Sequence, residues 1–458
     1  MIGNIHEECG IVGIYAKEKS DLHKLAYYGL YALQHRGQES SGIAASNGSD
    51  IKCIKDMGLV SEVYTPAILD SLSDSKIAIG HNRYSTTGSS VRSNAQPLTA
   101  HYSGGTIAIC HNGNLTNCEE LKADLTRSGA IFHTSVDSEV IAYLIAGKCN
   151  MSADLESAVR STLSLLHGGF SVLVMSRDKL IAARDPYGIK PLVMGTRNGA
   201  VVFASESCAL DSMGAEFLRD VEPGEIIVLD ENGMRNGRWV EERPMAKCIF
   251  EYIYFARSDS KMDGISVHGA RLKAGALLAR QYPVEADCVI GVPESGLDAA
   301  LGYSMESKIP YAKGFVKNGY IGRTFIKPTQ EERTEAVRIK LNPISESVKG
   351  KRVVMIDDSI VRGTTIANIV TMLRQAGATE VHVRISSPPF LYPCFYGTDV
   401  PSEEDLIASN HTVDEICQMI GADSLGYLKV SSLGEMIGED GHKYCDACFT
   451  GNYPDDKG

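Results

Sequence analysis

Apolar runs and helical periodicities alternate through the second half of the chain. Short runs rich in β-branched residues cover residues 287–292, 352–356 and 381–385, and each is long enough for a buried strand. Residues 271–281 and 365–375 carry apolar side chains at the spacing of a helix. Alternating β and α elements of this length predict an α/β domain with a mainly parallel sheet, in which ligands bind at the carboxyl ends of the strands.

The run at 352–356 leads into two adjacent carboxylates, Asp357 and Asp358, and then into a small, hydroxyl-rich turn at 359–365. A helical pattern follows directly and stops at Gly377, as a helix should. Backbone N–H groups in such a turn, at the positive end of a helix, form a ready phosphate site. The stretch therefore predicts a sugar-phosphate site, and its alternative is a buried strand followed by a solvated acidic turn.

The first half has a shorter β run at 9–15, headed by Cys9, and a helical stretch that breaks at Gly37. Considered singly, its polar residues have ordinary explanations. Cys9 fits a buried thiol, Arg83 a surface ion pair, and Asn112-Gly113 the tight turn of a hairpin. Five polar stretches nevertheless follow one another, at residues 33–42, 80–88, 94–97, 110–115 and 137–139.

Composition restricts the class of protein. A chain of 458 residues with 43% hydrophobic and 22% charged residues predicts two or three globular domains. A net charge of −12 without a dense basic tract argues against nucleic-acid and membrane-surface partners, and no apolar run approaches the roughly 20 residues of a membrane span. Residues 1–8 do not form a secretory signal, so we expect a cytoplasmic protein whose 12 cysteines are reduced.

Taken together, the five stretches resemble class II glutamine amidotransferases, the N-terminal nucleophile family, from Cys9 to about residue 240. The resemblance implies an α+β domain of layered antiparallel sheets with helices, in which Cys9 is the mature N-terminus and the nucleophile. Its own α-amine would be the base, because an amine with a pKa of about 8 is partly neutral near pH 7. Residues 1–8 would then be a propeptide. If they are an ordinary tail, this mechanism loses its base.

The same resemblance implies roles for four further residues. Arg83 would bind the α-carboxylate of glutamine and Asp137 its α-ammonium group, since opposite charges then meet at both ends of the amino acid. Asn112 and Gly113 would supply an oxyanion hole from a side-chain N–H and a backbone N–H. Because the α-amine is the base, the histidines of this half keep structural roles.

The stretch at 351–365 resembles the phosphoribosylpyrophosphate (PRPP) motif of type I phosphoribosyltransferases. This implies that Asp357 and Asp358 bind ribose hydroxyls, directly or through Mg²⁺, with Ser295 near the metal in a pyrophosphate-side loop at 293–296. A simple β-to-α turn is the alternative for that loop. The basic, glycine-hinged segment at 317–333 would be a mobile lid, or else a solvated face. The implied PRPP-binding residues are Asp357, Asp358, Ser359, Arg362, Gly363, Thr364, Thr365, Lys317 and Arg323.

Four cysteines form a further candidate site: Cys248, Cys394 and the C-x-x-C pair Cys445 and Cys448. Such a pair alone is compatible with zinc, redox chemistry or no function. In their surroundings the four resemble the ligands of the cluster-bearing branch of the glutamine PRPP amidotransferases, and that resemblance covers residues 9–449. It implies a 4Fe–4S cluster held by four thiolates, although a Cys₄ zinc site fits the count equally well.

The resemblance implies a propeptide at 1–8, a glutaminase domain at 9–240 and a phosphoribosyltransferase domain at 241–458. Ammonia from glutamine would displace pyrophosphate from PRPP, giving 5-phosphoribosylamine for purine synthesis. Purine nucleotides would inhibit, and the assembly would be a homotetramer. One alternative is another class II amidotransferase, such as a hexosamine-forming synthase, against which the Asp357-Asp358 motif argues. The other is a non-catalytic PRPP- or nucleotide-sensing regulator, against which the complete glutaminase set argues.

Overall fold

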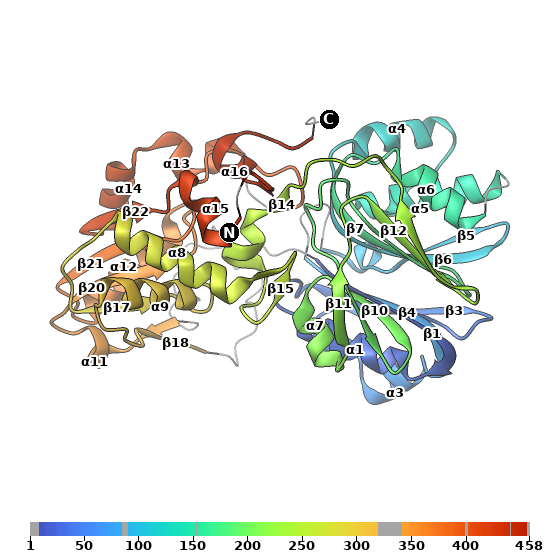
Figure 1. Cartoon of the computed structure of the whole chain (residues 1–458), viewed down its shortest axis with the longest axis horizontal. Coiled ribbons are helices and arrows are strands. Elements are labelled where there is room, and N and C mark those ends of the chain that lie inside the picture. Colours follow the sequence, from blue (N-terminus) through green and yellow to red (C-terminus); the bar gives the residue numbers. More distant parts are fainter. Residues whose placement is uncertain are drawn as a thin grey trace.

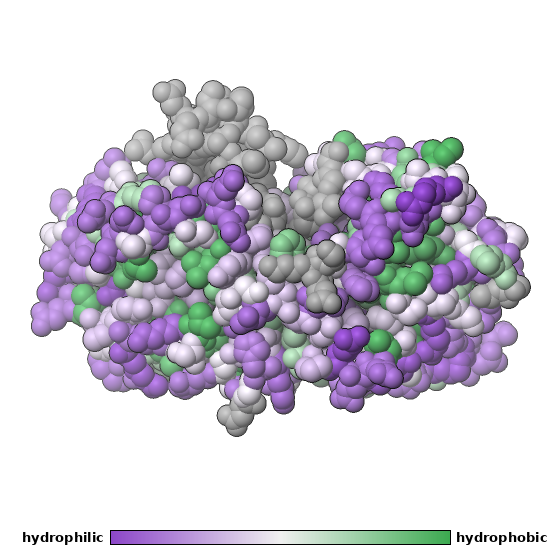
Figure 2. All heavy atoms as spheres, turned by 90° about the horizontal axis from the view of Figure 1, so that it is seen from above, coloured by the Kyte–Doolittle hydropathy of each residue, from purple (hydrophilic) through white to green (hydrophobic). Residues whose placement is uncertain are grey.

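The computed structural model describes residues 9–84, 90–151, 154–318, 341–398, 402–439 and 441–455. The chain forms two halves that lie side by side, with the first half in blue to green and the second in yellow to red (Figure 1). No helix in these ranges is long and apolar enough to span a membrane. The face seen from above is mainly hydrophilic, with small apolar patches on both halves (Figure 2).

Two antiparallel sheets form the first half. The strands of the first sheet are β1 (Gly10–Ser20), β2 (Ser40–Ser46), β3 (Ile51–Met57), β4 (Ser75–Arg83), β9 (Val193–Arg197), β10 (Ala200–Ala204) and β11 (Glu216–Asp220). Those of the second are β5 (Leu98–Tyr102), β6 (Gly105–Leu115), β7 (Gly168–Met175), β8 (Leu180–Arg184), β12 (Glu225–Asp230) and β13 (Gly233–Arg238). Their orders are β11-β9-β10-β1-β4-β2-β3 and β13-β12-β8-β7-β6-β5.

The two sheets face each other across one buried core. Alternate side chains of each strand point to opposite faces, so Ile11 and Ile79 of the first sheet meet Cys110 and Leu173 of the second. The opposite faces are covered by helices: α1 (Leu22–Ala32) and α7 (Ser207–Met213) on the first sheet, α5 (Asp137–Asn150) and α6 (Leu155–Leu163) on the second. This layered α+β arrangement confirms the fold expected for the first half.

The second half is built on a parallel sheet in the order β17-β20-β21-β22. Its core lies on both faces of that sheet, where α8 and α9 pack on one side and α12 and α14 on the other. Strands covered on both faces read as nearly continuous apolar runs, which is why the sequence pattern located them. The elements are β17 (Cys288–Gly291), β20 (Arg352–Asp357), β21 (Glu380–Ile385), β22 (Ser424–Tyr427), α8 (Val267–Gln281), α9 (Gly296–Ser307), α12 (Thr364–Gln375) and α14 (Val413–Ile420).

Short elements complete the fold. One two-stranded parallel ladder pairs β14 (Lys247–Cys248) with β23 (Tyr444–Cys445), which brings Cys248 opposite Cys445. The other short strands are β15 (Lys261–Met262), β16 (Ile265–Ser266), β18 (Phe315–Lys317) and β19 (Leu341–Pro343). The remaining helices are α2 (Val60–Val63), α3 (Pro66–Asp70), α4 (Cys118–Arg127), α11 (Ser345–Val348), α13 (Ile407–Asn410), α15 (Leu433–Ile437), α16 (Ala447–Thr450), the 3₁₀ turns η1 (Arg92–Asn94), η3 (Glu403–Asp405) and η4 (Val430–Ser432), and the π-helix η2 (Glu251–Phe255).

Candidate active sites

Cys9 lies at the entrance to β1 and is partly exposed. Its thiol donates a hydrogen bond to the carbonyl oxygen of Tyr84, just beyond β4, over 3.5 Å. The guanidinium of Arg36 holds the backbone from the other side, because Arg36 Nε donates to the carbonyl oxygen of Cys9 over 3.1 Å. The cysteine is therefore fixed at the end of the first sheet, with its sulfur at a strand terminus.

Asn112 and Gly113 lie inside β6, opposite Ser171 and Phe170 of β7, so the hairpin-turn alternative is wrong. Asn112 is fully buried, yet among the described residues neither its amide nitrogen nor its amide oxygen has a hydrogen-bond partner. Gly113 has φ +132°, and a Cβ there would lie 2.0 Å from the carbonyl oxygen of Gly169, so no larger residue fits. A buried, unpaired amide is costly, which indicates a group reserved for a ligand.

Cross-sheet contacts bring this amide toward Cys9. His81 of β4 and His111 of β6 meet across the two sheets, with 3.0 Å between His81 Nε2 and the carbonyl oxygen of His111. The next residue after His81, Asn82, pairs with Gly10, while the next after His111 is Asn112. The nucleophile and the unpaired amide therefore lie at the same end of the sandwich.

Two buried charges stand near the same end. Arg83, the last residue of β4, is 2% exposed, so the surface ion-pair alternative is wrong; its Nη1 lies 3.9 Å from Glu39 Oε2. Asp137 opens α5, and its carboxylate accepts a hydrogen bond from the Leu115 N–H over 3.1 Å and lies 3.3 Å from His111 Nδ1. Burial opposes ionisation of Asp137, but His111 and the neighbouring N–H groups outweigh it and lower the pKa. A fixed cation and a fixed anion suit the two ends of an amino acid.

The second site lies at the carboxyl edge of the parallel sheet. Ser295, in the loop after β17, donates a hydrogen bond to Asp358 Oδ1 over 2.5 Å, and Ser359 donates to the other oxygen of the same carboxylate. Burial and the charge of Asp358 raise the pKa of Asp357 well above its usual value, and burial also raises that of Asp358. Two crowded carboxylates of this kind favour a divalent cation or sugar hydroxyls as partners.

The turn after the carboxylates caps α12. Gly363 takes a left-handed conformation, φ +78°, immediately before the helix, and Thr364 and Thr365 form its first turn. The N–H groups at the start of this 12-residue helix suit a phosphate. Arg362 Nη2 donates a hydrogen bond to Asp405 Oδ2 over 3.1 Å, and the role of Arg362 in binding PRPP stays a prediction.

The lid expected at 317–333 falls largely outside the described residues, and Arg323 with it. Lys317 is described. It ends β18, and its Nζ lies 3.7 Å from Glu294 Oε1 in the Ser295 loop. Its ammonium group is therefore beside the loop that carries Ser295.

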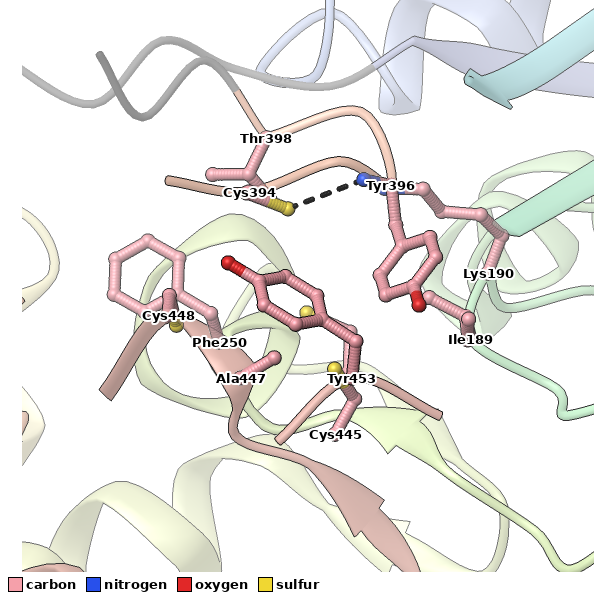
Figure 3. Close-up of a pocket in the computed structure, with 11 residues that line it drawn as sticks. Ile189, Lys190, Phe250, Cys394, Tyr396, Thr398, Cys445, Ala447, Cys448 and Tyr453 are labelled. Atoms are coloured by element: carbon pink, nitrogen blue, oxygen red, sulfur yellow. Dashed lines mark hydrogen bonds between the residues drawn. The ribbon is translucent and has the colours of Figure 1, made fainter. Parts of the chain in front are cut away.

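A third site joins the halves. Cys248, Cys394, Cys445 and Cys448 line one small pocket, whose other walls come from both halves (Figure 3). The Tyr396 N–H donates a hydrogen bond to Cys394 Sγ over 3.4 Å. Burial raises the pKa of Cys445 to about 12, and burial together with the other three thiols raises that of Cys448. The other lining residues are Ile189, Lys190, Phe250, Tyr396, Thr398, Ala447 and Tyr453.

The donor types at these sites fit the metals expected. Oxygen donors at Ser295, Asp357 and Asp358 suit Mg²⁺, and four converging thiols suit a 4Fe–4S cluster or zinc. Among the residues that the structure describes, however, no three His, Cys, Asp or Glu side chains are close enough together to hold a metal ion as they stand. Neither metal is therefore assigned from the geometry.

Sequence reasoning missed the buried ion network around Arg36, although Arg36 lies in one of the five stretches. Its guanidinium contacts Glu206 and Glu251, 170 and 215 residues further along the chain. No local period signals partners at such separations. The signal available in the sequence was an arginine directly before Gly37. In the structure this glycine is closely packed, because a Cβ added to it would lie 2.7 Å from the backbone of β4.

The first half places a cysteine directly before a strand, at the same end of the two sheets as the Asn112 amide, and the second is an α/β domain with paired aspartates. These features define a glutamine amidotransferase fused to a phosphoribosyltransferase. A family model described as a glutamine amidotransferase domain matches residues 81–212. The amidophosphoribosyltransferase of Bacillus subtilis (strain 168) is 48% identical, over 99% of this chain and 95% of its own length. That of Methanocaldococcus jannaschii is also 48% identical, over 97% of both chains. The chain belongs to the amidophosphoribosyltransferase family.

Solved structures agree with this assignment. A structure of the allosteric regulatory enzyme of purine biosynthesis superposes with a TM-score of 0.92, at 48% identity, and covers 97% of this chain and 96% of its own. The glutamine PRPP amidotransferase from B. subtilis complexed with ADP and GMP superposes with a TM-score of 0.91, at 48% identity and 97% coverage of both chains. The fold of both halves is thus that of the family.

Proposed function

We propose that this chain is an amidophosphoribosyltransferase in which Cys9 hydrolyses glutamine and the Asp357-Asp358 site transfers the ammonia to PRPP. The products are 5-phosphoribosylamine, pyrophosphate and glutamate, in the first committed step of purine synthesis. The reaction class follows from the family. The observation that carries the residue assignment is the Asn112 amide, which is fully buried and has no hydrogen-bond partner in the part of the chain that the structure describes. A regulator without turnover has no use for an amide kept unpaired at that cost.

The glutaminase reaction uses four groups around Cys9. Once residues 1–8 are removed, the α-amine of Cys9 accepts the thiol proton, and the sulfur attacks the side-chain amide carbon of glutamine. The Asn112 side-chain N–H and the Gly113 backbone N–H donate hydrogen bonds to the oxyanion. Ammonia leaves with a proton from the α-ammonium group, and water then hydrolyses the thioester to glutamate. Arg83 and Asp137 bind the α-carboxylate and the α-ammonium group of the substrate.

The transferase reaction takes place at the carboxyl edge of the parallel sheet. Asp357 and Asp358 bind the ribose hydroxyls, and the N–H groups from Ser359 to Thr365 bind the 5-phosphate. Ammonia attacks the anomeric carbon as the bond to pyrophosphate breaks. Ser295 and the two aspartates would hold Mg²⁺, which when bound supplies positive charge for the leaving pyrophosphate. Lys317 is placed to meet the same charge, and Arg323 is assigned to it from the sequence resemblance.

The four cysteines are proposed to hold a 4Fe–4S cluster, with a Cys₄ zinc site as the alternative. One feature supports a bound metal: the four thiols line one pocket. Thiolates in so apolar a place need a cation beside them. Iron and zinc analysis of the purified protein distinguishes the two.

The wider assignments belong to the same proposal. The domains are 9–240 and 241–458, and residues 1–8 are a propeptide outside the described residues. None of the 12 cysteines, all of which lie in the described residues, forms a disulfide, in keeping with a reducing, cytoplasmic compartment. Purine nucleotides are proposed inhibitors, because a relative was solved with ADP and GMP. A homotetramer, implied by the sequence resemblance, is tested by light scattering.

The test combines an assay with N-terminal sequencing. Purified protein mixed with glutamine, PRPP and Mg²⁺ should release pyrophosphate, and its first residue should be Cys9. Cys9→Ala should lose glutamine-dependent synthesis by many powers of ten, since removing a nucleophile forfeits most of the catalytic gain. Ammonia at alkaline pH should restore synthesis in this variant. Fully active enzyme that begins at Met1 would rule out the α-amine as the base.

A further inference from the structure

Arg36 connects the nucleophile to the second half of the chain. Its side chain is fully buried, and besides the Cys9 carbonyl it donates to two carboxylates. Nη1 lies 2.7 Å from Glu206 Oε1 and 2.9 Å from Glu251 Oε2, and Nη2 lies 2.6 Å from Glu251 Oε1. Glu251 therefore grips the guanidinium with both oxygens, a geometry that fixes a planar group in direction as well as position.

Glu206 is fully buried, and residues of both halves donate hydrogen bonds to its carboxylate. It accepts hydrogen bonds from His35 Nε2 over 2.7 Å, from the Arg257 N–H over 2.9 Å and from Ser260 Oγ over 2.6 Å. With so many donors its position depends little on Arg36. Glu251 itself belongs to the second half, so a shift of that half moves its carboxylate, and with it the guanidinium, directly.

Glu251 also opens the π-helix η2, a rare element that is frequent at functional sites. The guanidinium of Arg271 in α8 holds this helix by its carbonyls, at 2.9 Å from Tyr252 O, 2.9 Å from Tyr254 O and 2.7 Å from Ala256 O. Arg271 Nη1 also donates to Ser258 Oγ over 3.2 Å. The position of Glu251 is thus tied to α8.

The same contacts continue to the PRPP site. Ser258 Oγ donates to Asp298 Oδ2 over 2.6 Å, and Asp298 lies in the first turn of α9. That helix begins at Gly296, next to Ser295, whose hydroxyl donates to Asp358. Hydrogen bonds and short backbone segments therefore run without a gap from the proposed PRPP carboxylates to the carbonyl of the nucleophile.

We propose that Glu251 is a positioning residue for the glutaminase site. Its carboxylate holds the Arg36 guanidinium in place on the Cys9 carbonyl, and this contact depends on the state of the Asp358 site. The inference rests on the proposed function. An error of about 1 Å in the placement of a reacting group can cost roughly 100-fold in rate, so a small shift of Arg36 is enough to slow the attack. Glutamine binding depends on Arg83 and Asp137 and is not altered by this shift.

The test compares Glu251→Gln with a matched control, Asp263→Asn. Asp263 makes an equally buried, two-pronged ion pair across the halves, with Arg184, at 2.8 and 3.0 Å. Within the part of the chain that the structure describes, neither Arg184 nor Asp263 forms a hydrogen bond or ion pair with Cys9. Glu251→Gln should lower kcat for glutamine hydrolysis at least 10-fold with KM changed less than threefold, while ammonia-dependent synthesis stays within twofold of wild type. Asp263→Asn should leave both activities within threefold.

A second readout follows the thiol itself. Alkylation of Cys9 by iodoacetamide, measured across pH, should depend on PRPP in the wild type and lose that dependence in Glu251→Gln. Should Glu251→Gln fail to fold, Glu251→Asp keeps the buried charge but shortens the reach, and the same split between the two activities is expected. Wild-type kcat in both Glu251 variants, or an equal loss in Asp263→Asn, would overturn the inference. A wild-type protein that releases no pyrophosphate would instead overturn the proposed function.

Discussion

The side-chain amide of Asn114 donates a hydrogen bond to the carbonyl oxygen of Phe395, 281 residues further along the chain, over 2.9 Å. Asn114 lies two residues after Asn112 on β6. Phe395 directly follows Cys394, which lines the cysteine pocket. Two residues on, a Cβ at Gly397 would lie 3.1 Å from the carbonyl carbon of Gly113. The loop that carries one cysteine is thus packed against the strand proposed to form the oxyanion hole.

Loss of the metal should therefore reach the glutaminase site. Cys394→Ser should remove the brown colour and the iron, about four atoms per chain in the wild type for a 4Fe–4S cluster. We expect glutamine hydrolysis to fall further than ammonia-dependent synthesis, because the loop contacts Gly113. Iron analysis with both assays checks this. Cys417→Ser, at a half-buried thiol outside the pocket, is the control. A colourless wild type with one zinc per chain would move the four cysteines to a structural zinc site.

Asn112→Ala tests the oxyanion assignment. Removing one such donor typically costs about 100- to 1,000-fold in kcat, with a smaller effect on KM, because the hydrogen bond strengthens in the transition state. Steady-state glutaminase kinetics measure both constants. Asn117→Ala removes an exposed amide that bonds Leu165 and His167 and should leave kcat nearly unchanged. Equal, small effects in the two variants would refute the role of Asn112.

The aspartate pair should be needed for transfer but not for the basal glutaminase activity measured without PRPP. Asp357→Asn combined with Asp358→Asn should abolish pyrophosphate release and leave basal glutaminase largely intact, since their carboxylates lie in the other half. Removing Mg²⁺ with EDTA should have the same effect on the wild type. Both activities are measured on one preparation whose folding is checked by circular dichroism. An equal loss of both activities in a folded variant would contradict the division of labour.

Acid should destabilise the fold through His81. Burial lowers the pKa of His81 from an unfolded value near 6.5 to about 3, so the native state excludes a proton that the unfolded chain binds below pH 6.5. The cost is absent at higher pH and grows as pH falls toward 3. Between pH 7.5 and 5.5 it amounts to about 1.4 kcal/mol. Urea unfolding of the wild type and His81→Gln should show this extra loss only in the wild type.

Many helices and strands could be predicted from the pattern of apolar residues in the sequence. The helix predicted at 365–375 is α12 (Thr364–Gln375), and the strand predicted at 381–385 is β21 (Glu380–Ile385), because a doubly covered parallel sheet produces continuous apolar runs. Asn112 and Gly113 were harder. The dipeptide Asn112-Gly113 favours a turn. In the structure both residues pair with β7 and so lie within a strand, where Gly113 packs closely against Gly169. Arg36 and Glu251 are far apart in the sequence, and no helix or strand periodicity connects them. Their contact could therefore not be predicted from the sequence alone.

The parallel ladder between β14 and β23 has a consequence for how the protein is made. A ribosome delivers the chain from its N-terminus, and domains generally fold in that order. The strands that the structure describes in the first half end at Arg238, yet the loop that packs on Gly113 and the strand that brings Cys445 beside Cys248 are translated only later. A nascent chain released at residue 240 should accordingly fold but hydrolyse glutamine poorly, which a truncated protein would show directly. On that expectation, a growing chain would consume little glutamine until the residues that contact Gly113 from the second half have been added.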